Sequence, residues 1–387
     1  MPYRILSRDE HFQTAGRKRI LALDGGGLRG ILTLGFLGPI EKMLQARHGG
    51  DSAFRLCHYF DLIAGTSTGA IIAAALAIGL SVEEVVAHYQ RLGKAVFSKD
   101  WFREGIVRAR YDEATLIKHL KLVFGEDRTL GDSSIQTGLL IMTKRLDTGS
   151  PWPLSNNPRS RYFRAQPADP WISNADYPLW KVVRASTAAP SYFEPEPITI
   201  VSEGGKRAVT GTFVDGGVSP FNNPSLQAFM YATLEGYKVG WKTGAEQLLL
   251  VSVGTGASDP GQTPSRIAAK GAIKALFSLM DDCAALVETI MQWMSASPTA
   301  REIDGDIGDL RSDLIAGVPL LSYLRYNARL SRDEVDRLLP ALSAKQADSL
   351  GEMDNPGNLD ALLALGAAAA AGNVQDDDFP KAFDLGD

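Results

Sequence analysis

The stretch DLIAGTSTGA, residues 61–70, joins an apolar run to a run of small residues through the pattern G-x-S-x-G. The apolar run predicts a buried strand, and AIIAAALA (70–77) predicts a helix directly behind it. In that setting the pattern exposes a nucleophilic serine, because Gly65 and Gly69 let the chain turn sharply. Ser67 is therefore expected at the top of the strand, near the positive end of the helix. The alternative interpretation is an ordinary glycine-serine turn.

Short apolar runs alternate with longer helical patterns along most of the chain. Strands are expected at 20–23, 60–65, 138–146, 209–217 and 247–256, and helices at 31–46, 69–78, most of 82–124 and from 182 to just before Pro190. Residues 150–160 are rich in proline and asparagine and predict a loop. Alternating strands and helices favour parallel strands. The predicted fold class is α/β, a three-layer α/β/α fold with a mostly parallel central sheet and extra C-terminal helices.

A single domain is expected, since no linker or internal repeat divides the chain of 387 residues. Beyond residue 256 the pattern is helical, with helices expected at 267–294 and 332–350. The predicted parts are a polar N-terminal tail (1–17), the domain itself (18–350, with its motif-bearing core at 18–256 and a helical part at 257–350), and an alanine-rich, then acidic, C-terminal tail (351–387) that is expected to contain a short helix before its frayed end.

The composition excludes several classes of function. A formal net charge of −5 gives no basic surface for nucleic acid. Cys57 and Cys283 cannot form a disulfide framework and have no companions for a zinc site, so both are predicted to be buried. The N-terminal residues contain no apolar signal segment, and the longest apolar run, 70–80, is too short to span a bilayer. We expect a cytoplasmic protein whose membrane contact, if any, is peripheral.

A serine nucleophile needs a base, and the histidines of this chain are poorly placed to supply one. Many hydrolases have the chain order serine, acid, histidine, with the histidine late in the sequence. The last histidine of this chain is His119, so no late histidine is present. His58 is retained only as a weak candidate. Asp215 instead follows an apolar run and precedes Gly216 and Gly217, at the carboxyl end of a predicted strand where active sites of parallel sheets gather. The alternative is that Asp-Gly forms an ordinary turn.

The stretch RILALDGGGLRG, residues 19–30, matches the glycine spacing G-x-G-x-x-G of a dinucleotide-binding loop. A dinucleotide site also needs an acidic residue at the end of the next strand, but the next strand ends at the serine turn. A glycine run before a helix can instead supply backbone N–H groups to an oxyanion. The loop is better suited to an oxyanion than to a pyrophosphate.

DGGGLRG, GTSTG and DGG, in this order, resemble the patatin-like phospholipase family. ASTAAPSYF (185–193) is similar to that family's third conserved block, LLLVSVGTG (248–256) to its late core strand, and SYLRYNARL (322–330) to a downstream element of bacterial members. The resemblance extends from about residue 18 to about residue 256. Each motif is weak alone, but together they are specific.

The resemblance implies a role for each motif residue. Ser67 would be the nucleophile and Asp215 the general base of a Ser-Asp dyad. The remaining implied roles are oxyanion donors (Gly25, Gly26 and Gly27), support of the loop or contact with a lipid phosphate (Arg29 and Gly30), the nucleophile turn (Gly65 and Gly69) and the turn after the base (Gly216 and Gly217). No metal and no organic cofactor is implied.

The implied activity is hydrolysis of carboxylic esters in phospholipids or lysophospholipids. Some bacterial relatives are antiviral effectors switched on by nucleotide second messengers, and this chain is a candidate for such regulation. The alternatives are acyl transfer by the same dyad and a non-catalytic nucleotide-binding module built on the glycine loop. The head group, acyl position and oligomeric state are not determined by the sequence.

Two segments combine apolar and aromatic residues in a way that fits either lipid contact or core packing. Residues 97–111 contain aromatic and basic residues and could form a lid. Residues 279–294 contain methionine and tryptophan at helical spacing and could contact an acyl chain. Core packing is the more common role of both patterns. DGDIGDL (304–310) lacks the ligand spacing of a calcium loop and is predicted to be a turn.

Overall fold

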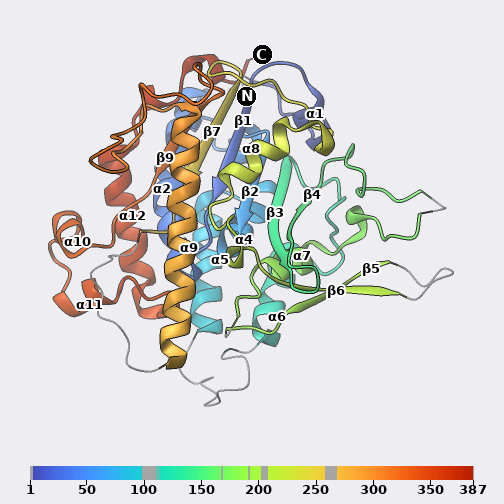
Figure 1. Cartoon of the computed structure of the whole chain (residues 1–387), viewed down its shortest axis with the longest axis horizontal. Coiled ribbons are helices and arrows are strands. Elements are labelled where there is room, and N and C mark those ends of the chain that lie inside the picture. The colour runs from blue at the N-terminus through green and yellow to red at the C-terminus, as the bar shows by residue number, and fades with distance from the viewer. Residues whose placement is uncertain are drawn as a thin grey trace.

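The fold is given by a computed structural model, in which the strands lie at the centre of the molecule and helices cover both faces (Figure 1). The structure describes residues 3–97, 111, 113–166, 169–190, 192–201, 208–257 and 268–386, with side chains from residue 278 onward in the last range. The strands are β1 (Lys18–Leu23), β2 (Leu62–Thr66), β3 (Gly138–Arg145), β4 (Pro151–Ser155), β5 (Glu196–Val201), β6 (Val209–Asp215), β7 (Leu248–Val253), β8 (Ser295–Ala296) and β9 (Leu321–Tyr326).

Most helices are short, and the longest ones pack along the sheet. They are α1 (Arg8–Gln13), α2 (Gly30–Arg47), α3 (Leu56–Tyr59), α4 (Thr68–Ala77), α5 (Val82–Val96), α6 (Glu113–Phe124), α7 (Leu179–Ser186), α8 (Ser225–Thr233), α9 (Ala268–Trp293), α10 (Arg332–Leu338), α11 (Ala344–Ser349) and α12 (Leu359–Asn373). Single 3-10 turns include η1 (Gly27–Arg29), directly before α2, and η4 (Gly216–Val218), directly after β6.

The strands form one mixed sheet in the order β5-β6-β3-β2-β1-β7-β9-β8, with β4 paired to β3. Strands β3, β2, β1, β7 and β9 are parallel to their neighbours in this series, whereas β4 and β6 pair antiparallel with β3. All five predicted strands are present. Because β1, β2 and β7 are parallel neighbours, the loops that follow them emerge at one edge of the sheet.

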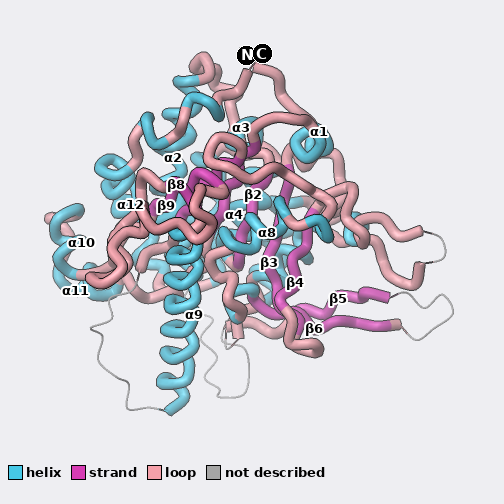
Figure 2. Tube along the Cα trace, turned by 45° about the horizontal axis from the view of Figure 1, so that its top comes forward, coloured by secondary structure: helices cyan, strands magenta, loops and turns pink. Residues whose placement is uncertain are grey.

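Successive residues of the central strands face two separate hydrophobic cores. Leu21 and Ile63 pack with residues of α2, α4, α5, α7 and α12 on one face. Ile20 and Leu62 pack with residues of α8 and α9 on the other face. The three layers and the predicted fold class are thereby confirmed. Figure 2 shows α9 projecting below the rest of the molecule and the β5–β6 pair extending away from it at the lower right.

The sheet contains strands that the sequence did not predict. Residues 150–160, expected to be a loop, contain β4, and the C-terminal part, expected to be helical, contributes β8 and β9. All residues of β9 are buried, including Ser322 and Arg325. These two polar residues interrupt the apolar run, so the strand lacked its usual signature.

The helix expected over 332–350 is two helices, α10 and α11. Pro340 lies between them. Proline lacks an N–H group and disfavours helical geometry in the preceding residue, which favours the break between α10 and α11.

Both predicted tails contain ordered helices. Helix α1 begins with a capping box at Ser7 and buries His11 and Phe12. Helix α12 packs against α2 so closely that a Cβ on Gly366 would lie 2.2 Å from the Leu32 carbonyl oxygen. The alanine-rich composition provides this close packing, because small side chains let two helix backbones approach each other.

No helix among the described residues has both the length and the apolar character needed to cross a membrane.

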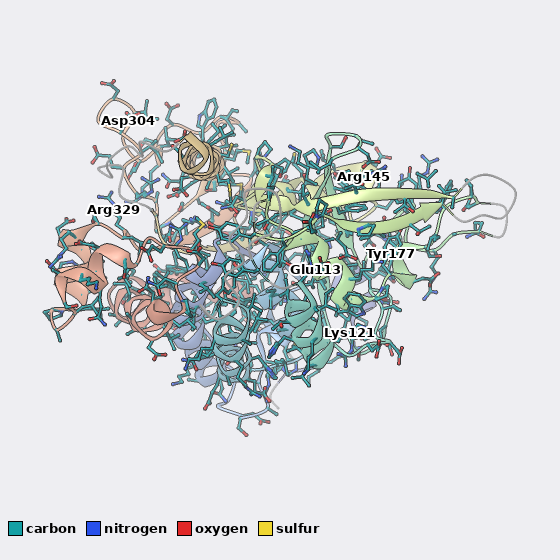
Figure 3. The ribbon with its side chains drawn as sticks, turned by 90° about the horizontal axis from the view of Figure 1, so that it is seen from below. Glu113, Lys121, Arg145, Tyr177, Asp304 and Arg329 are labelled. Carbon is teal, nitrogen blue, oxygen red and sulfur yellow. The ribbon has the colours of Figure 1, made fainter. Side chains whose placement is uncertain are left out.

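The acidic turn around Asp304 lies beyond α9, on the opposite side of the molecule from Arg145 (Figure 3). Asp304 accepts hydrogen bonds from the backbone N–H groups of Asp306 and Ile307, which is the geometry of a turn, as predicted.

Candidate active site

Ser67 sits in a sharp turn between β2 and α4. Its backbone is in an unusual conformation for a residue with a side chain, with φ of 55° and ψ of −122°. A Cβ on Gly69 would lie 2.2 Å from the Leu23 carbonyl oxygen, so glycine is required where the turn crosses β1. The Ser67 N–H donates to Ser186 Oγ at 2.8 Å, and Ser186 Oγ donates to the Met142 carbonyl oxygen. The turn is thus fixed from α7 and β3.

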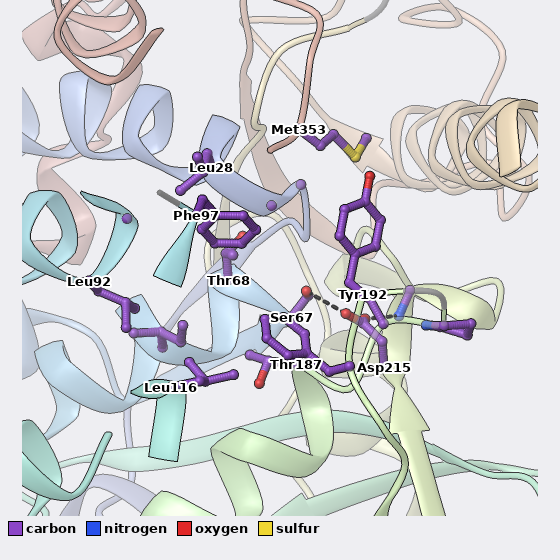
Figure 4. A pocket seen from close by; sticks show the side chains of 18 of the residues that line it. Leu28, Ser67, Thr68, Leu92, Phe97, Leu116, Thr187, Tyr192, Asp215 and Met353 are labelled. Carbon is purple, nitrogen blue, oxygen red and sulfur yellow. Dashed lines mark hydrogen bonds between the residues drawn. The ribbon is translucent and has the colours of Figure 1, made fainter. Parts of the chain in front are cut away.

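The Ser67 hydroxyl is hydrogen-bonded to the side chain of Asp215 (Figure 4). Ser67 Oγ donates to Asp215 Oδ2 at 2.5 Å, and the Gly217 N–H donates to Asp215 Oδ1 at 2.7 Å. The second contact fixes the carboxylate, so one oxygen remains directed at the serine. A hydroxyl bonded to a buried carboxylate is the arrangement of a nucleophile and its base.

Asp215 reaches Ser67 by a different route from the one expected. The sequence predicted the carboxyl end of a parallel strand, but β6 runs antiparallel to β3. Strand β6 enters from beyond the carboxyl edge and ends at Asp215, which pairs with Thr143. The neighbouring residue Met142 pairs with Thr66, directly before Ser67. The predicted position is correct, but the reason given for it is wrong.

Burial makes Asp215 a stronger base than an ordinary aspartate. Its side chain is 3% exposed, and desolvation raises its pKa from 3.8 to about 6. The hydrogen bonds from Ser67 and Gly217 and the charge of Arg184 act in the opposite direction and limit the rise. A carboxyl group with this pKa is still ionised at neutral pH, and it accepts a proton more readily than a solvated aspartate does.

The glycine loop lies beside the dyad, but only part of it can donate to an oxyanion. The Gly25 N–H already donates to the Asn222 carbonyl oxygen at 3.1 Å, so the prediction of Gly25 as an oxyanion donor is wrong. The N–H groups of Gly26 and Gly27 make no hydrogen bond within the described residues, and both residues line the cavity at Ser67. Gly27 has φ of +59°, which favours glycine.

A further backbone donor was missed in the sequence. Thr68, the residue after Ser67, is the first residue of α4, and its N–H has no partner among the residues described. In hydrolases with a G-x-S-x-G turn, this position supplies one oxyanion donor. That rule could have identified Thr68 from the motif alone.

Arg29, within the glycine loop, is buried inside the protein. Its side chain is 2% exposed and does not line the cavity. Burial lowers its pKa, and the charge of Asp281 on α9 partly offsets this effect. Gly30 packs tightly, since a Cβ there would lie 2.6 Å from Tyr89 Oη. The arrangement fits support of the loop and offers no access for a lipid phosphate at Arg29.

Arg325, on β9, holds the residue that begins the glycine loop. Its two terminal nitrogens bond Asp24 at 3.0 and 2.6 Å, and both side chains are buried. Ser252 Oγ also accepts from Arg325, at 2.8 Å. The stretch SYLRYNARL was noted in the sequence, but nothing local indicated that its arginine contacts Asp24.

A mostly apolar cavity opens onto the dyad. It encloses about 850 Å³ including its mouth, and its apolar walls include Leu28, Ile71, Leu92, Phe97 and Leu116 (Figure 4). Within the described parts of the chain, no lysine, arginine or histidine lines it. The cavity therefore suits a hydrocarbon chain better than a charged group.

The 279–294 segment contributes to the wall of the cavity and to the core. Met280, in the 279–294 segment, lines the cavity near Gly217, whereas Val287 and Met291 pack in the core. Of the 97–111 segment, only Phe97 and Tyr111 are described, and their rings lie 4.7 Å apart. The rest of that segment, for which a lid was the less common alternative to core packing, lies outside the described residues.

His58 is not at the site. Its Nδ1 lies 3.0 Å from Tyr3 Oη and accepts the Arg55 N–H, and burial lowers its pKa to about 4. It contacts neither Ser67 nor Asp215, so its weak candidacy as a base is wrong. His11, for which no acidic partner was expected, lies 2.9 Å from Asp61 in the core. Cys57 is buried as predicted, whereas Cys283 is only partly buried.

Comparison with known proteins agrees with the motifs. The sequence model of the patatin-like phospholipase family matches residues 21–229. Two cGAMP-activated phospholipases are similar, with 27% identity in Escherichia coli (strain TW11681) and 28% in Vibrio cholerae serotype O1, over 66% and 70% of this chain. A cUMP-AMP-activated phospholipase from Escherichia coli is 32% identical over 62% of this chain.

The aligned regions cover 66%, 73% and 64% of these three relatives. The matched family segment contains the glycine loop, Ser67 and Asp215, and it accounts for more than half of the chain. The chain therefore belongs to the patatin-like phospholipase family, as its motifs predicted.

Proposed function

We propose that this protein hydrolyses the carboxylic ester bonds of phospholipids or lysophospholipids through a dyad of Ser67 and Asp215. The observation that carries the proposal is the 2.5 Å hydrogen bond between Ser67 Oγ and Asp215 Oδ2 beside an apolar cavity. The raised pKa of Asp215 supports its role as the base. The acyl chain would occupy the cavity, with the ester carbonyl next to Ser67.

In the first half of the reaction, Ser67 Oγ bonds to the ester carbonyl carbon while its proton passes to Asp215 Oδ2. The carbonyl oxygen becomes an oxyanion, which the N–H groups of Gly26, Gly27 and Thr68 would stabilise. When the C–O bond of the ester breaks, the leaving alkoxide takes the proton from Asp215. The fatty acyl group remains on Ser67.

In the second half, Asp215 takes a proton from water while the water oxygen bonds to the acyl carbon. The bond from that carbon to Ser67 Oγ then breaks, and Oγ recovers the proton from Asp215. The products are the free fatty acid and the regenerated dyad. No charged side chain other than Asp215 is required in this sequence, in keeping with the cavity walls.

The decisive experiment measures fatty acid release from phosphatidylcholine and lysophosphatidylcholine vesicles. Ser67→Ala should abolish release, whereas Ser52→Ala, at an exposed serine away from the site, should retain it. Release that survives Ser67→Ala would contradict the proposal, and a nucleotide-binding module would show no Ser67-dependent release. Transfer of the acyl group to an added alcohol in preference to water would identify an acyltransferase.

Regulation by a nucleotide and action at the inner face of the membrane are also proposed. The support for regulation by a nucleotide is that three relatives are named for activation by cGAMP or cUMP-AMP. The same vesicle assay with each cyclic dinucleotide should show increased Ser67-dependent release for at least one of them. Equal rates with and without both nucleotides would contradict this part of the proposal.

A further inference from the structure

The carbonyl oxygens of the glycine loop are held by donors from elsewhere in the chain. Thr255 Oγ1 donates to the Gly25 carbonyl oxygen at 3.0 Å, and Asn222 Nδ2 donates to the same oxygen at 3.3 Å. Tyr89 Oη donates to the Gly27 carbonyl oxygen at 2.6 Å. The Leu28 N–H donates to the Met353 carbonyl oxygen at 2.7 Å. The loop is thus fixed by side chains and backbone from four separate segments.

The contact with Gly25 also determines the direction of the Gly26 N–H. In a planar trans peptide, the C=O and the N–H point in opposite directions. The C=O of Gly25 and the N–H of Gly26 belong to one such peptide. Since Thr255 and Asn222 hold the oxygen on the protein side, the Gly26 N–H is directed to the other side, and Gly26 lines the cavity at Ser67.

Thr255 is itself rigidly placed. It follows β7, which pairs with β1 so that Val253 lies beside Leu23, and the loops after these two strands are neighbours. The flanking glycines are held by the end of β9, because the Gly254 N–H donates to the Tyr326 carbonyl oxygen and the Gly256 N–H to Asn327 Oδ1. Thr255 is 4% exposed.

Thr255 packs directly against Gly26. A Cβ on Gly26 would lie 2.2 Å from Thr255 Oγ1, so the hydroxyl is in direct contact with the peptide that it orients. Thr255 lies beyond residues 21–229, the segment matched by the family model. The part of the chain after that segment therefore contributes directly to the geometry of the loop.

We propose that the Thr255 hydroxyl is a positioning residue for the oxyanion hole, aligning the Gly26 N–H with the ester oxygen during the reaction. This inference rests on the proposed function. Its effect belongs to the tetrahedral intermediate and the transition states on either side of it, because the bound ester carries no full negative charge on its carbonyl oxygen. Loss of one oxyanion donor typically lowers the rate a hundredfold to a thousandfold. Misalignment of the donor should lower kcat by about tenfold to a hundredfold.

The test compares Thr255→Val with Thr255→Ser. Valine keeps the shape and removes the hydroxyl, whereas serine keeps the hydroxyl. With a soluble ester, Thr255→Val should lower kcat about tenfold to a hundredfold with KM within about twofold, and Thr255→Ser should stay within about threefold of wild type. A Thr255→Val enzyme with more than half of the wild-type kcat would overturn the inference, as would equal losses in both variants.

A matched control separates loss of stability from loss of alignment. Thr137 Oγ1 donates to the Phe60 carbonyl oxygen at 2.6 Å and is equally buried, but it lies before β3, away from the loop. Thr137→Val should lower the unfolding temperature about as much as Thr255→Val and leave kcat unchanged. An equal loss of kcat in Thr137→Val would contradict a positioning role for Thr255.

A second readout distinguishes failure of this inference from failure of the proposed function. A fluorophosphonate probe phosphonylates an activated serine whatever the natural substrate, and the attack needs the same oxyanion donors. Thr255→Val should slow the labelling of Ser67 about tenfold or more relative to wild type and to Thr137→Val. Unchanged labelling would overturn the inference, whereas a wild type that is labelled but releases no fatty acid would overturn only the substrate assignment.

Discussion

Asp215 and Asp61 are both buried aspartates at ends of strands, yet their surroundings are opposite. Asp215 contacts neutral donors, the Ser67 hydroxyl and the Gly217 N–H. Asp61 lies beside Arg19 at 3.1 Å and His11 at 2.9 Å, with Lys18 at 3.8 Å. Burial raises the pKa of Asp215 to about 6. Burial acts in the same direction on Asp61, but the cations outweigh it and hold its pKa well below the usual range.

This difference separates the carboxylate that we propose as the base from one that supports the fold. A buried carboxylate surrounded by cations is strongly stabilised in its charged form and is a weak base. A buried carboxylate with only neutral donors is destabilised in its charged form and takes up a proton more readily. Both aspartates follow or precede apolar runs in the sequence, so only their partners distinguish them.

The largest expected effect is on catalysis at Asp215. Asp215→Asn removes the base while keeping the shape, and it should lower kcat about a hundredfold to ten-thousandfold. The measurement is ester hydrolysis under saturating substrate. Near-full activity in this variant would show that the proton goes elsewhere.

The same type of substitution at Asp61 should affect stability and not chemistry. Asp61→Asn leaves Arg19 and Lys18 without their buried partner and should lower the free energy of unfolding by about 3–5 kcal/mol. Chemical denaturation measures this loss. The activity per folded molecule should stay within about threefold of wild type, and a much larger drop in kcat would contradict the distinction drawn between the two sites.

The stability of the Asp215→Asn variant should depend on pH in a characteristic way. Below pH 4 the Asp215 carboxyl group is protonated in both the folded and the unfolded wild type, so its burial does not lower the free energy of unfolding there. Between pH 4 and pH 6 the carboxyl group ionises in the unfolded state but stays largely protonated in the folded state. The free energy of unfolding of the wild type therefore falls by up to about 3 kcal/mol, whereas that of the variant does not.

Denaturation of both proteins at several pH values measures this difference. The advantage of Asp215→Asn should grow from pH 4 to pH 6 and then level off. A variant that is less stable than wild type at pH 7 would mean that Asp215 is not destabilised by its burial.

The activity of the wild type should depend on the ionisation of Asp215. Because the pKa is about 6, kcat/KM should be nearly constant above pH 7 and fall about tenfold for each pH unit below 6. A soluble ester avoids pH effects on vesicles. An acidic limb centred near pH 4 would indicate that the base is an ordinary, solvated carboxylate.

The smallest effect is expected at His58. His58→Gln should change kcat by less than about twofold, because His58 contacts Tyr3 and Arg55 and its low pKa keeps it neutral. Its loss should appear only as a modest decrease in unfolding temperature. A hundredfold decrease in kcat would revive histidine as the base and contradict the dyad.

Much of the fold followed from local patterns. The five predicted strands and the helix behind Ser67 have short, strong hydrophobic signals, and all are present. The elements that were missed have signals that tertiary contacts override. Strand β9 contains Arg325, which is buried beside Asp24 and Glu288, and the polar N-terminal segment forms α1, which buries His11 and Phe12.

The sequence by itself determined the nucleophile turn, the glycine loop and the aspartate before Gly-Gly, because each depends on residue types at fixed local spacing. Only the tertiary structure decided which N–H groups are free, which aspartate is the stronger base and which side chains hold the loop. Those properties arise between residues far apart in the chain. The contacts of Ser67 with Asp215, Gly25 with Thr255 and Asp24 with Arg325 span 148, 230 and 301 residues. Burial and hydrogen bonding act over ångströms in space, so no local pattern encodes them.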